Sequence, residues 1–350
     1  MASAASGSES YRPAMAENRQ VIIASLPEDA LQASDFKLEA GPMPEAGDGQ
    51  VLCRTLALTI GAGQRAGLQG SASYAGAPET GRVMGGTGLA RVEQSNDPAF
   101  EIGSLVTAAT GWQDYSVHDG RTVTPVDAEH ADPAMSLGIL GTNGLTAYFG
   151  LLDLGRPQSG DTVLVSAAAG SVGHVVGQIA KIKGARVVGV AGSDEKLRML
   201  TDQLGFDAAV NYKDSEFRNA FRAATPDRIN VYFDNTGGPI LESALFRMAP
   251  HGRIVCCGAV SLYDTSHPGP GPRGVPGLLV NNRVRMEGFL VFDYRDRFAA
   301  ARAEMAGWVT RGDLVPRTTE FDGLDQAPQA FVELLGGGTI GTTIVRVATS

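Results

Sequence analysis

The chain has 350 residues, of which 43% are hydrophobic and 19% charged, and its formal net charge is −9. The composition is typical of a soluble globular protein. The length favours two domains. The negative charge argues against nucleic acid or an anionic membrane surface as the main partner.

Residues 1–16 hold no apolar core of signal-peptide length, and we expect a disordered extension there. The most apolar stretch, Leu137 to Leu154, is broken by Gly138, Gly141, Asn143 and Gly144, so no membrane span is predicted. The cysteines are Cys53, Cys256 and Cys257. The adjacent pair lies in an apolar run that suits buried thiols better than a disulfide framework, which favours a cytoplasmic location.

Residues 20–130 contain short β-type runs separated by turn signals, among them "VLCRTLALTI", "SLVTAATGWQDYSV" and "RTVTPV". Such spacing predicts a β-rich domain. From residue 161 apolar strands alternate with helices of ordinary length, beginning with the strand "TVLVSA" and the helix "SVGHVVGQIAKIK". Fully apolar strands alternating with helices predict a parallel, doubly wound sheet. A Pro/Gly-rich loop, 264–277, and a further helix follow, and we expect "GTIGTTIVRV" to return to the β-rich domain.

The segment "VLVSAAAGSVGHVVGQIAKIKG" has the context of a dinucleotide-binding turn, with a strand before it and a helix after it. Ala168, Gly170 and Gly173 occupy the three small positions, and Ser171 and Val172 lie between them at the start of the helix. Small residues there permit a tight turn, close approach of a pyrophosphate and close helix–strand packing. The alternative is a tight turn without a ligand; the repeated strand–helix units favour the cofactor.

The second strand of this unit lacks the acidic residue that holds the ribose hydroxyls in NAD enzymes. It ends in Ala191, Gly192 and Ser193, and Lys196 follows in the first turn of the next helix. Ser193 and Lys196 are candidates for holding the 2′-phosphate of NADP. The alternative is a serine N-cap followed by a solvated lysine, and the residues alone leave both interpretations open.

Polar side chains also follow the fourth and fifth strands of the predicted sheet, where ligands lie in open α/β folds. Asp234 and Asn235 end the fourth strand, and Gly258 and Tyr263 come after the fifth. The phenol of Tyr263 is able to donate a hydrogen bond or a proton; packing under the Pro-rich loop is the alternative.

Other chemistries find no support in the sequence. The five histidines do not pair at metal-ligand spacing, there is no CxxC, and there is no GxSxG elbow. Metal and acyl-enzyme chemistry are therefore not expected.

Five segments, taken in order, resemble the zinc-independent medium-chain dehydrogenase/reductases, and most closely the leukotriene/prostaglandin reductases and alkenal double-bond reductases. They are "GLTAYFGL", "AAAGSVGHVVGQIAKIKGARVVGVAGSDEK", "LGFDAAVNYK", "YFDNTGG" and "RMEGFLV". The resemblance implies an α/β fold with a Rossmann doubly wound parallel sheet at 140–316. It also implies a discontinuous GroES-like β-rich domain, 17–139 with 317–350, and a homodimer.

The same resemblance implies NADPH as reductant and a small conjugated carbonyl compound as substrate. Lys196 and Tyr212 would contact the 2′-phosphate, and Asn235 and Gly258 would lie along the nicotinamide. We expect Gly192 and Cys257 to line the cofactor as well. Tyr263 would lie near the nicotinamide ribose and the substrate carbonyl, where it is the candidate catalytic residue. Hydride transfer to the β-carbon would then produce an enolate that Tyr263 stabilises.

Two departures from the family fall on the substrate side. Members usually carry Asp-Pro-Tyr-Met-Arg where this chain has Gly61, Ala62, Gly63, Gln64 and Arg65. Asn143 likewise replaces a usual proline. We expect Arg65, Asn143 and Tyr263 to line the substrate pocket. The altered loop keeps alternatives open: a quinone reductase, a biosynthetic enzyme acting on an unusual conjugated substrate, or an NADPH-binding protein without turnover.

Overall fold

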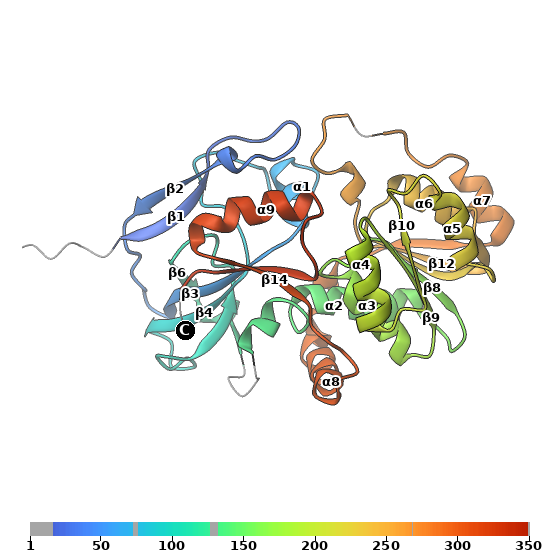
Figure 1. The fold of residues 1–350 in the computed structure, drawn as a ribbon. Coiled ribbons are helices and arrows are strands. Elements are labelled where there is room, and N and C mark those ends of the chain that lie inside the picture. Colours follow the sequence, from blue (N-terminus) through green and yellow to red (C-terminus); the bar gives the residue numbers. More distant parts are fainter. Residues whose placement is uncertain (1–16, 73–75, 127–131, 268, 349–350) are drawn as a thin grey trace, which may run out of the picture.

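The computed structural model describes residues 17–72, 76–126, 132–267 and 269–348. The prediction made for residues 1–16 lies outside this set. The described chain forms two lobes (Figure 1). One lobe combines N-terminal segments, drawn in blue and cyan, with C-terminal segments, drawn in red, whereas the middle of the chain forms the other lobe.

The middle of the chain forms a six-stranded sheet in the order β10-β9-β8-β11-β12-β13. Every neighbouring pair is parallel. In chain order this is 3-2-1-4-5-6, the Rossmann arrangement, so the predicted doubly wound parallel sheet is confirmed. The strands are β8 (Thr162–Val165), β9 (Arg186–Ala191), β10 (Ala208–Asn211), β11 (Ile229–Asp234), β12 (Met248–Cys256) and β13 (Arg285–Gly288).

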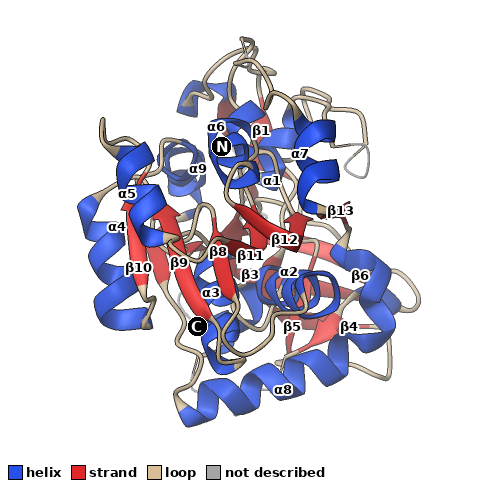
Figure 2. Ribbon diagram, turned by 90° about the vertical axis from the view of Figure 1, so that its right-hand side faces the viewer, coloured by secondary structure: helices blue, strands red, loops and turns tan. Residues whose placement is uncertain are grey.

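Helices cover both faces of this sheet (Figure 2). On one face α2 (Thr142–Phe149), α3 (Gly173–Ile182) and α8 (Phe298–Arg311) share a core with Val163 and Phe233. The opposite face packs against α5 (Phe217–Ala224), α6 (Gly238–Leu245) and α7 (Val275–Asn282). Since successive strand residues point to opposite faces, a sheet covered on both sides needs the continuous apolar runs seen in the sequence. The short helix α4 (Asp194–Arg198) follows β9.

The other lobe contains a seven-stranded sheet in which β14-β15-β3-β4-β5-β7 form one path and β6 pairs with β3. Its strands are β3 (Gln50–Ile60), β4 (Gly88–Ser95), β5 (Leu105–Ala108), β6 (Tyr115–Asp119), β7 (Thr124–Pro125), β14 (Thr318–Asp322) and β15 (Thr342–Arg346). β15 is antiparallel to β3, which confirms the predicted return of the C-terminal segment. The lobe also holds β1 (Asn18–Ile23), β2 (Phe36–Gly41), α1 (Gly63–Leu68) and α9 (Ala327–Leu335).

Two local predictions differ from the structure. The run "SLVTAATGWQDYSV" forms two strands, β5 and β6, which pair with different neighbours. The break coincides with Gly111, whose φ of +65° is outside the range of a strand. The apolar strand that was expected to hold both adjacent cysteines ends at Cys256, so Cys257 lies just beyond it.

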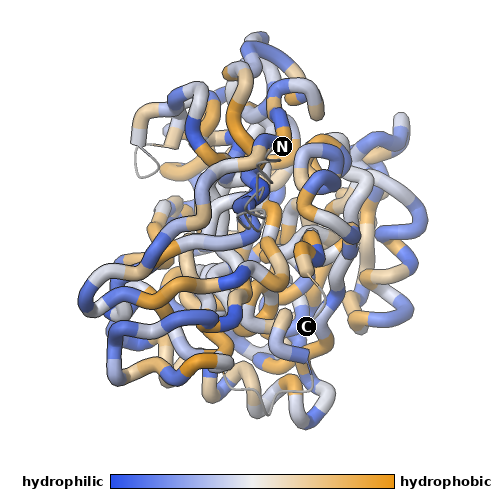
Figure 3. The backbone as a smooth tube through the Cα atoms, turned by 90° about the vertical axis from the view of Figure 1, so that its left-hand side faces the viewer, coloured by the Kyte–Doolittle hydropathy of each residue, from blue (hydrophilic) through white to orange (hydrophobic). Residues whose placement is uncertain are grey.

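Polar and apolar residues are interspersed along the β-rich lobe (Figure 3). Within the described ranges, no helix is both long and apolar enough to cross a membrane.

Candidate active site

The turn between β8 and α3 leaves room only for small residues. A Cβ atom at Gly173 would lie 2.3 Å from the carbonyl oxygen of Ala167 and 2.8 Å from Cα of Ala168. One at Gly170 would lie 3.2 Å from the same carbonyl oxygen. Ala167 itself has a φ of +46°, which few residues other than glycine adopt. The turn is therefore tight, and it leads directly into the N-terminus of a ten-residue helix, which favours a bound anion.

The helix that follows the turn packs unusually close to Phe206, which lies just before β10. A Cβ at Gly177 would lie 1.9 Å from Cζ of Phe206, so only glycine permits this approach. Ala168 is fully buried and its backbone N–H donates to the carbonyl oxygen of Val190, 3.0 Å away. Ser171 and Val172 are half-buried beside it. These contacts fix the start of α3 against β9.

Two lysines lie at the end of β9, where an NAD enzyme would carry an acid. Gly192 lies beneath Tyr212 and Lys213, since its Cβ would be 2.9 Å from Cε1 of Tyr212 and 3.1 Å from Cε of Lys213. Lys196 is half-buried, and burial together with the charge of Lys213 lowers its pKa. The two neighbouring positive charges of Lys196 and Lys213 would attract an anion to this place. Lys213 was missed by the sequence analysis, although it directly follows Tyr212.

Ser193 and Lys196 use their polar groups differently. The Ser193 hydroxyl caps α4 by accepting from the backbone N–H of Lys196 at 3.4 Å, as the N-cap alternative proposed. Lys196 is not a solvated lysine, because its Nζ donates to the carbonyl oxygen of Gly337 at 2.7 Å. Tyr212 is 45% exposed and remains available to a ligand at this place.

Asp234 organises the carboxyl end of β11. It is 2% exposed, and its Oδ1 accepts hydrogen bonds from the Tyr232 hydroxyl at 2.7 Å and from the backbone of Thr236 and Gly237 at 2.9 and 2.8 Å. Burial and the Asp234 charge hold the pKa of Tyr232 well above its ordinary value. The phenol therefore stays a hydrogen-bond donor to the carboxylate, and the turn after β11 is held rigidly.

Asn235 joins the ends of β11 and β8. Its backbone N–H donates to the Ser166 hydroxyl at 2.9 Å, and its Nδ2 donates to the Ser166 carbonyl at 2.7 Å. A Cβ at Gly258 would lie 3.0 Å from the Asn235 carbonyl oxygen. The structure thus brings Asn235 and Gly258 together at one edge of the sheet. Ser166, which the sequence analysis did not single out, is the group that links them to β8.

A cavity of about 620 Å³ lies between residues of the two lobes. Its wall is mostly apolar, with polar groups that include Gln64, Thr142 and Asn143 and the charged side chains of Glu79 and Arg82. Cys257 also lines it, and burial together with the charges of Asp234 and Cys256 raises the pKa of its thiol to about 12. The thiol is therefore neutral at physiological pH. Other lining residues include Ile23, Gly61, Gly63, Leu68, Met84, Phe289, Leu290 and Phe292.

Of the three residues expected to form the substrate pocket, Asn143 lies in the cavity wall, whereas Arg65 and Tyr263 are outside it. Arg65 is 1% exposed. Its Nε donates to Asp264 at 2.9 Å, and its Nη2 donates to the carbonyl oxygens of Asp29 at 2.8 Å and Pro27 at 3.2 Å. A buried guanidinium is better satisfied by these acceptors than by an apolar wall. Tyr263 is half-buried and follows the short helix Val260–Leu262.

The residues at the strand ends fit a dinucleotide phosphate better than a metal ion. The tight glycine turn, the start of α3 and the two lysines provide a cradle and positive charge. Across the described part of the chain, no group of three or more His, Cys, Asp or Glu side chains is placed to hold a metal ion.

A Rossmann sheet, a basic site at the end of its second strand and a cavity at its carboxyl edge define a dinucleotide-dependent oxidoreductase. The sequence comparisons agree. Residues 19–126 match the family described as "N-terminal domain of oxidoreductase", and residues 171–307 match the one described as "Zinc-binding dehydrogenase".

Three known proteins show the similarity along nearly the whole chain. The NADPH-dependent curcumin reductase of Escherichia coli K12 is 39% identical, over 95% of this chain and 97% of its own. Prostaglandin reductase 1 of Mus musculus is 40% identical, over 89% of this chain and 94% of its own. The crystal structure of CurA in complex with NADPH from Vibrio vulnificus has a TM-score of 0.91 and 36% identity, with 95% of this chain and 100% of that chain covered.

The chain therefore belongs to the medium-chain dehydrogenase/reductase superfamily, in the family of the leukotriene/prostaglandin reductases and alkenal double-bond reductases. The resemblance inferred from the sequence motifs is confirmed. So is the combination of a Rossmann sheet with a GroES-like β-rich lobe.

Proposed function

We propose that this protein is an NADPH-dependent reductase of the carbon–carbon double bond in α,β-unsaturated ketones or aldehydes. Relatives similar over nearly the whole chain carry the names of NADPH-dependent curcumin reductase and prostaglandin reductase 1. The observation in this structure that carries the proposal is the end of β9. Lys196 and Lys213 lie there instead of an acid, and the cavity opens at the carboxyl edge of the same sheet.

NADPH would be held along the carboxyl edge of the six-stranded sheet. The turn after β8 would take the pyrophosphate, and Lys196 with Tyr212 would take the 2′-phosphate, supported by Lys213. Asn235 and Gly258 would lie along the nicotinamide. The full set that we assign to the cofactor is Ala168, Gly170, Ser171, Val172, Gly173, Gly192, Ser193, Lys196, Tyr212, Asn235, Cys257, Gly258 and Tyr263.

NADPH, when bound, supplies a hydride, which the β-carbon of the substrate accepts. The electron pair of the double bond then moves to the carbonyl oxygen as an enolate. Tyr263 lies outside the cavity wall described above, so in this scheme its phenol would extend from the loop after β12 to that oxygen. A hydrogen bond donated there, where the negative charge develops, would lower the barrier. The enolate then accepts a proton from water at its α-carbon, which gives the saturated product. No metal is required, because the conjugated carbonyl carries the charge, and the neutral Cys257 thiol is not a nucleophile in this scheme.

The proposal is tested by following NADPH oxidation against a panel of enals, enones and quinones, with NADH as the comparison cofactor. We expect turnover with enals or enones, and deuterium from the 4-deuterated cofactor at the β-carbon of the product. Turnover of quinones alone would favour the quinone reductase. Tight NADPH binding without any turnover would favour a binding protein.

The domain division follows the two sheets. All strands of the six-stranded sheet lie between Thr162 and Gly288, and we assign 140–316 to the NADPH-binding domain. Residues 17–139 with 317–350 would form the substrate-side domain. The described cysteines are free thiols, which supports a cytoplasmic location.

A homodimer is supported by the edge of the Rossmann sheet. β13 is the last strand in the sheet order, and Val280 on α7, the helix that precedes it in the chain, is 73% exposed. An unpaired edge, together with an exposed apolar side chain, favours association with another strand. Light scattering after size exclusion is the test: a mass near one chain would contradict the dimer.

A further inference from the structure

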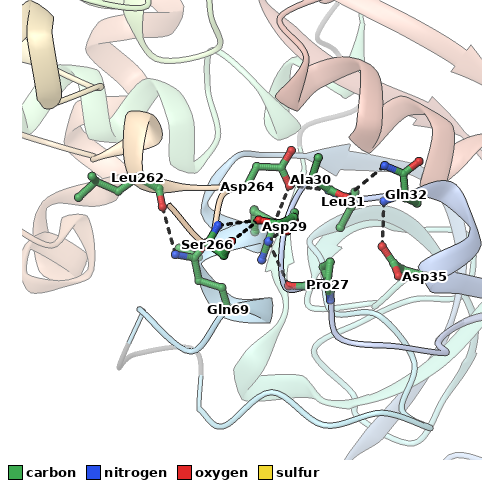
Figure 4. Close-up of polar contacts among 12 residues, drawn as sticks. Pro27, Asp29, Ala30, Leu31, Gln32, Asp35, Gln69, Leu262, Asp264 and Ser266 are labelled. Atoms are coloured by element: carbon green, nitrogen blue, oxygen red, sulfur yellow. Dashed lines mark hydrogen bonds and ion pairs between the residues drawn. The ribbon is translucent and has the colours of Figure 1, made fainter. Parts of the chain in front are cut away.

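Asp264 connects the two lobes next to Tyr263. It belongs to the loop that leaves the Rossmann sheet after β12, yet its Oδ1 accepts from groups of the β-rich lobe. These are Nε of Arg65 on α1, at 2.9 Å, and the backbone N–H of Leu31, at 2.7 Å. Figure 4 shows Asp264 lying among Asp29, Ala30 and Leu31.

Residues on both sides of Asp264 also bind the β-rich lobe. The carbonyl oxygen of Leu262 accepts from Nε2 of Gln69 at 3.2 Å. The backbone N–H of Ser266 donates to the Asp29 carboxylate at 2.9 Å, and the Ser266 hydroxyl donates to the same oxygen. In the chain Tyr263 lies between Leu262 and Asp264, which are both bound by the opposite lobe, so that lobe holds the loop on either side of Tyr263. Figure 4 shows Leu262 beside Gln69 and Ser266 beside Asp29.

Arg65 is the centre of this contact. Its side chain is 1% exposed, and its Nη2 also holds the carbonyl oxygens of Pro27 and Asp29. Asp264 has a φ of +63°, a left-handed conformation that aspartate and asparagine adopt more readily than other residues with a side chain. Two hydrogen bonds to its carboxylate hold the residue in that conformation. The backbone direction immediately after Tyr263 therefore depends on Arg65.

We propose that Arg65 and Asp264 are positioning residues, whose ion pair holds the Tyr263 phenol at the substrate carbonyl. This inference rests on the proposed function for its catalytic consequence. It also gives a reason why an arginine follows the altered 61–64 segment: Arg65 acts through the loop of Tyr263 and does not touch the substrate.

The first test compares Asp264→Ala with Asp264→Asn. We expect the alanine variant to lower kcat about tenfold or more, because small displacements of a catalytic group have large effects, while the Kd for NADPH changes less than about twofold. Asparagine tolerates a positive φ and its carbonyl oxygen can accept from Leu31 and Arg65, so it should restore much of the rate.

Combination with Tyr263→Phe separates positioning from a general structural role. If Asp264 acts through Tyr263, Asp264→Ala should cause a much smaller further loss of kcat in the Tyr263→Phe background. If the fold-loss of kcat in the double variant equals the product of the losses in the two single variants, the proposal is overturned. Asp161→Ala is the matched control, since Asp161 also pairs with an arginine, Arg253, at 2.7 Å with both side chains largely buried. An equal fall of kcat in this control would also overturn it.

Amide hydrogen exchange tests the contact of Asp264 with Leu31 and Arg65 without a measurement of enzyme activity. Asp264→Ala should speed amide exchange in residues 27–35 and 259–267, including the Leu31 amide, and leave the strands of the Rossmann sheet unchanged. Unchanged exchange at Leu31 would show that Asp264 does not hold this loop. If the wild-type protein reduces none of the tested substrates, but the Leu31 amide exchanges faster in Asp264→Ala than in wild type, the proposed function is wrong and the contact between the lobes is confirmed.

Discussion

The ammonium of Lys196 donates a hydrogen bond to the carbonyl oxygen of Gly337 at 2.7 Å. Lys196 lies on α4 at the rim of the Rossmann sheet, whereas Gly337 follows α9 in the β-rich lobe. The bond therefore links the lobes beside the site proposed for the 2′-phosphate. A phosphate would offer Lys196 a charged acceptor in place of a neutral one, and such a hydrogen bond is stronger.

Lys196→Ala should weaken the use of NADPH roughly 10- to 100-fold, because a hydrogen bond to a charged group contributes about 1.5–3 kcal/mol. The use of NADH, which lacks the 2′-phosphate, should change little. The measurement is kcat/KM for each cofactor, with Lys183→Ala as the control at the far end of α3. An equal loss for both cofactors would contradict the assignment.

Gly173→Ala should disrupt the turn after β8. The new Cβ would meet backbone atoms of Ala167 and Ala168, which cannot rotate away. We expect a loss of about 1–3 kcal/mol in the free energy of unfolding, as for other overpacked sites, together with weaker NADPH binding. Urea unfolding and a fluorescence titration with NADPH measure the two effects. In Gly277→Ala, the control, the new Cβ has no atom within 4 Å, and both quantities should stay near wild type.

The fold was predictable because its main constraints are local. Strands buried on both faces need continuous apolar runs, and the alternation of such runs with helices identifies a parallel sheet. The requirement for glycine at 173 is also local, since the colliding atoms lie five and six positions earlier. Patterns within a few residues of one another therefore predicted the sheet and its turn.

Contacts between the lobes were not predictable in the same way. Arg65 and Asp264 are 199 positions apart, and Lys196 and Gly337 are 141 apart. Nothing in the residues around Arg65 indicates which acceptor it meets, so its assignment to the pocket wall followed from its place in the altered loop. The pairing depends on how the two lobes pack, which a single sequence does not specify.

Tyr263→Phe should lower kcat about 100- to 1,000-fold, the range seen when one donor to a developing oxyanion is removed. The Kd for NADPH should stay within about twofold, since the change removes one hydroxyl and keeps the ring. Pre-steady-state measurement of NADPH oxidation gives the chemical step directly. Tyr115→Phe, on β6 of the opposite lobe, is the control. Unchanged turnover in Tyr263→Phe would remove this residue from the mechanism.

Gly63→Tyr should narrow the cavity. Gly63 is one of the residues that line the cavity. A bulky side chain there should lower kcat/KM for long or aromatic enones about tenfold or more and affect a short enal much less, because only the large substrates need the space. The ratio of the two kcat/KM values is the measurement, and an equal fall for both substrates would contradict it.

His174 should make stability depend on pH. The residue is fully buried, and its Nδ1 lies 2.8 Å from the carbonyl oxygen of Gly170, so Nδ1 carries the proton and donates. Burial, with a smaller contribution from Arg317, lowers the pKa of His174 to about 4. An unfolded histidine has a pKa of about 6.5, so between these values the unfolded chain binds the extra proton.

The contribution of His174 is therefore complete above pH 6.5 and is lost as the pH falls towards 4. The loss would reach about 3 kcal/mol, from 1.36 kcal/mol for each pKa unit. His174→Asn cannot titrate, and its unfolding free energy should fall less than that of the wild type between pH 7.5 and pH 5, as measured by urea unfolding at several pH values. His251→Asn is the control, because His251 is exposed and asparagine tolerates its φ of +62°. Parallel pH profiles for wild type and His174→Asn would show that this buried imidazole does not control the acid sensitivity of the fold.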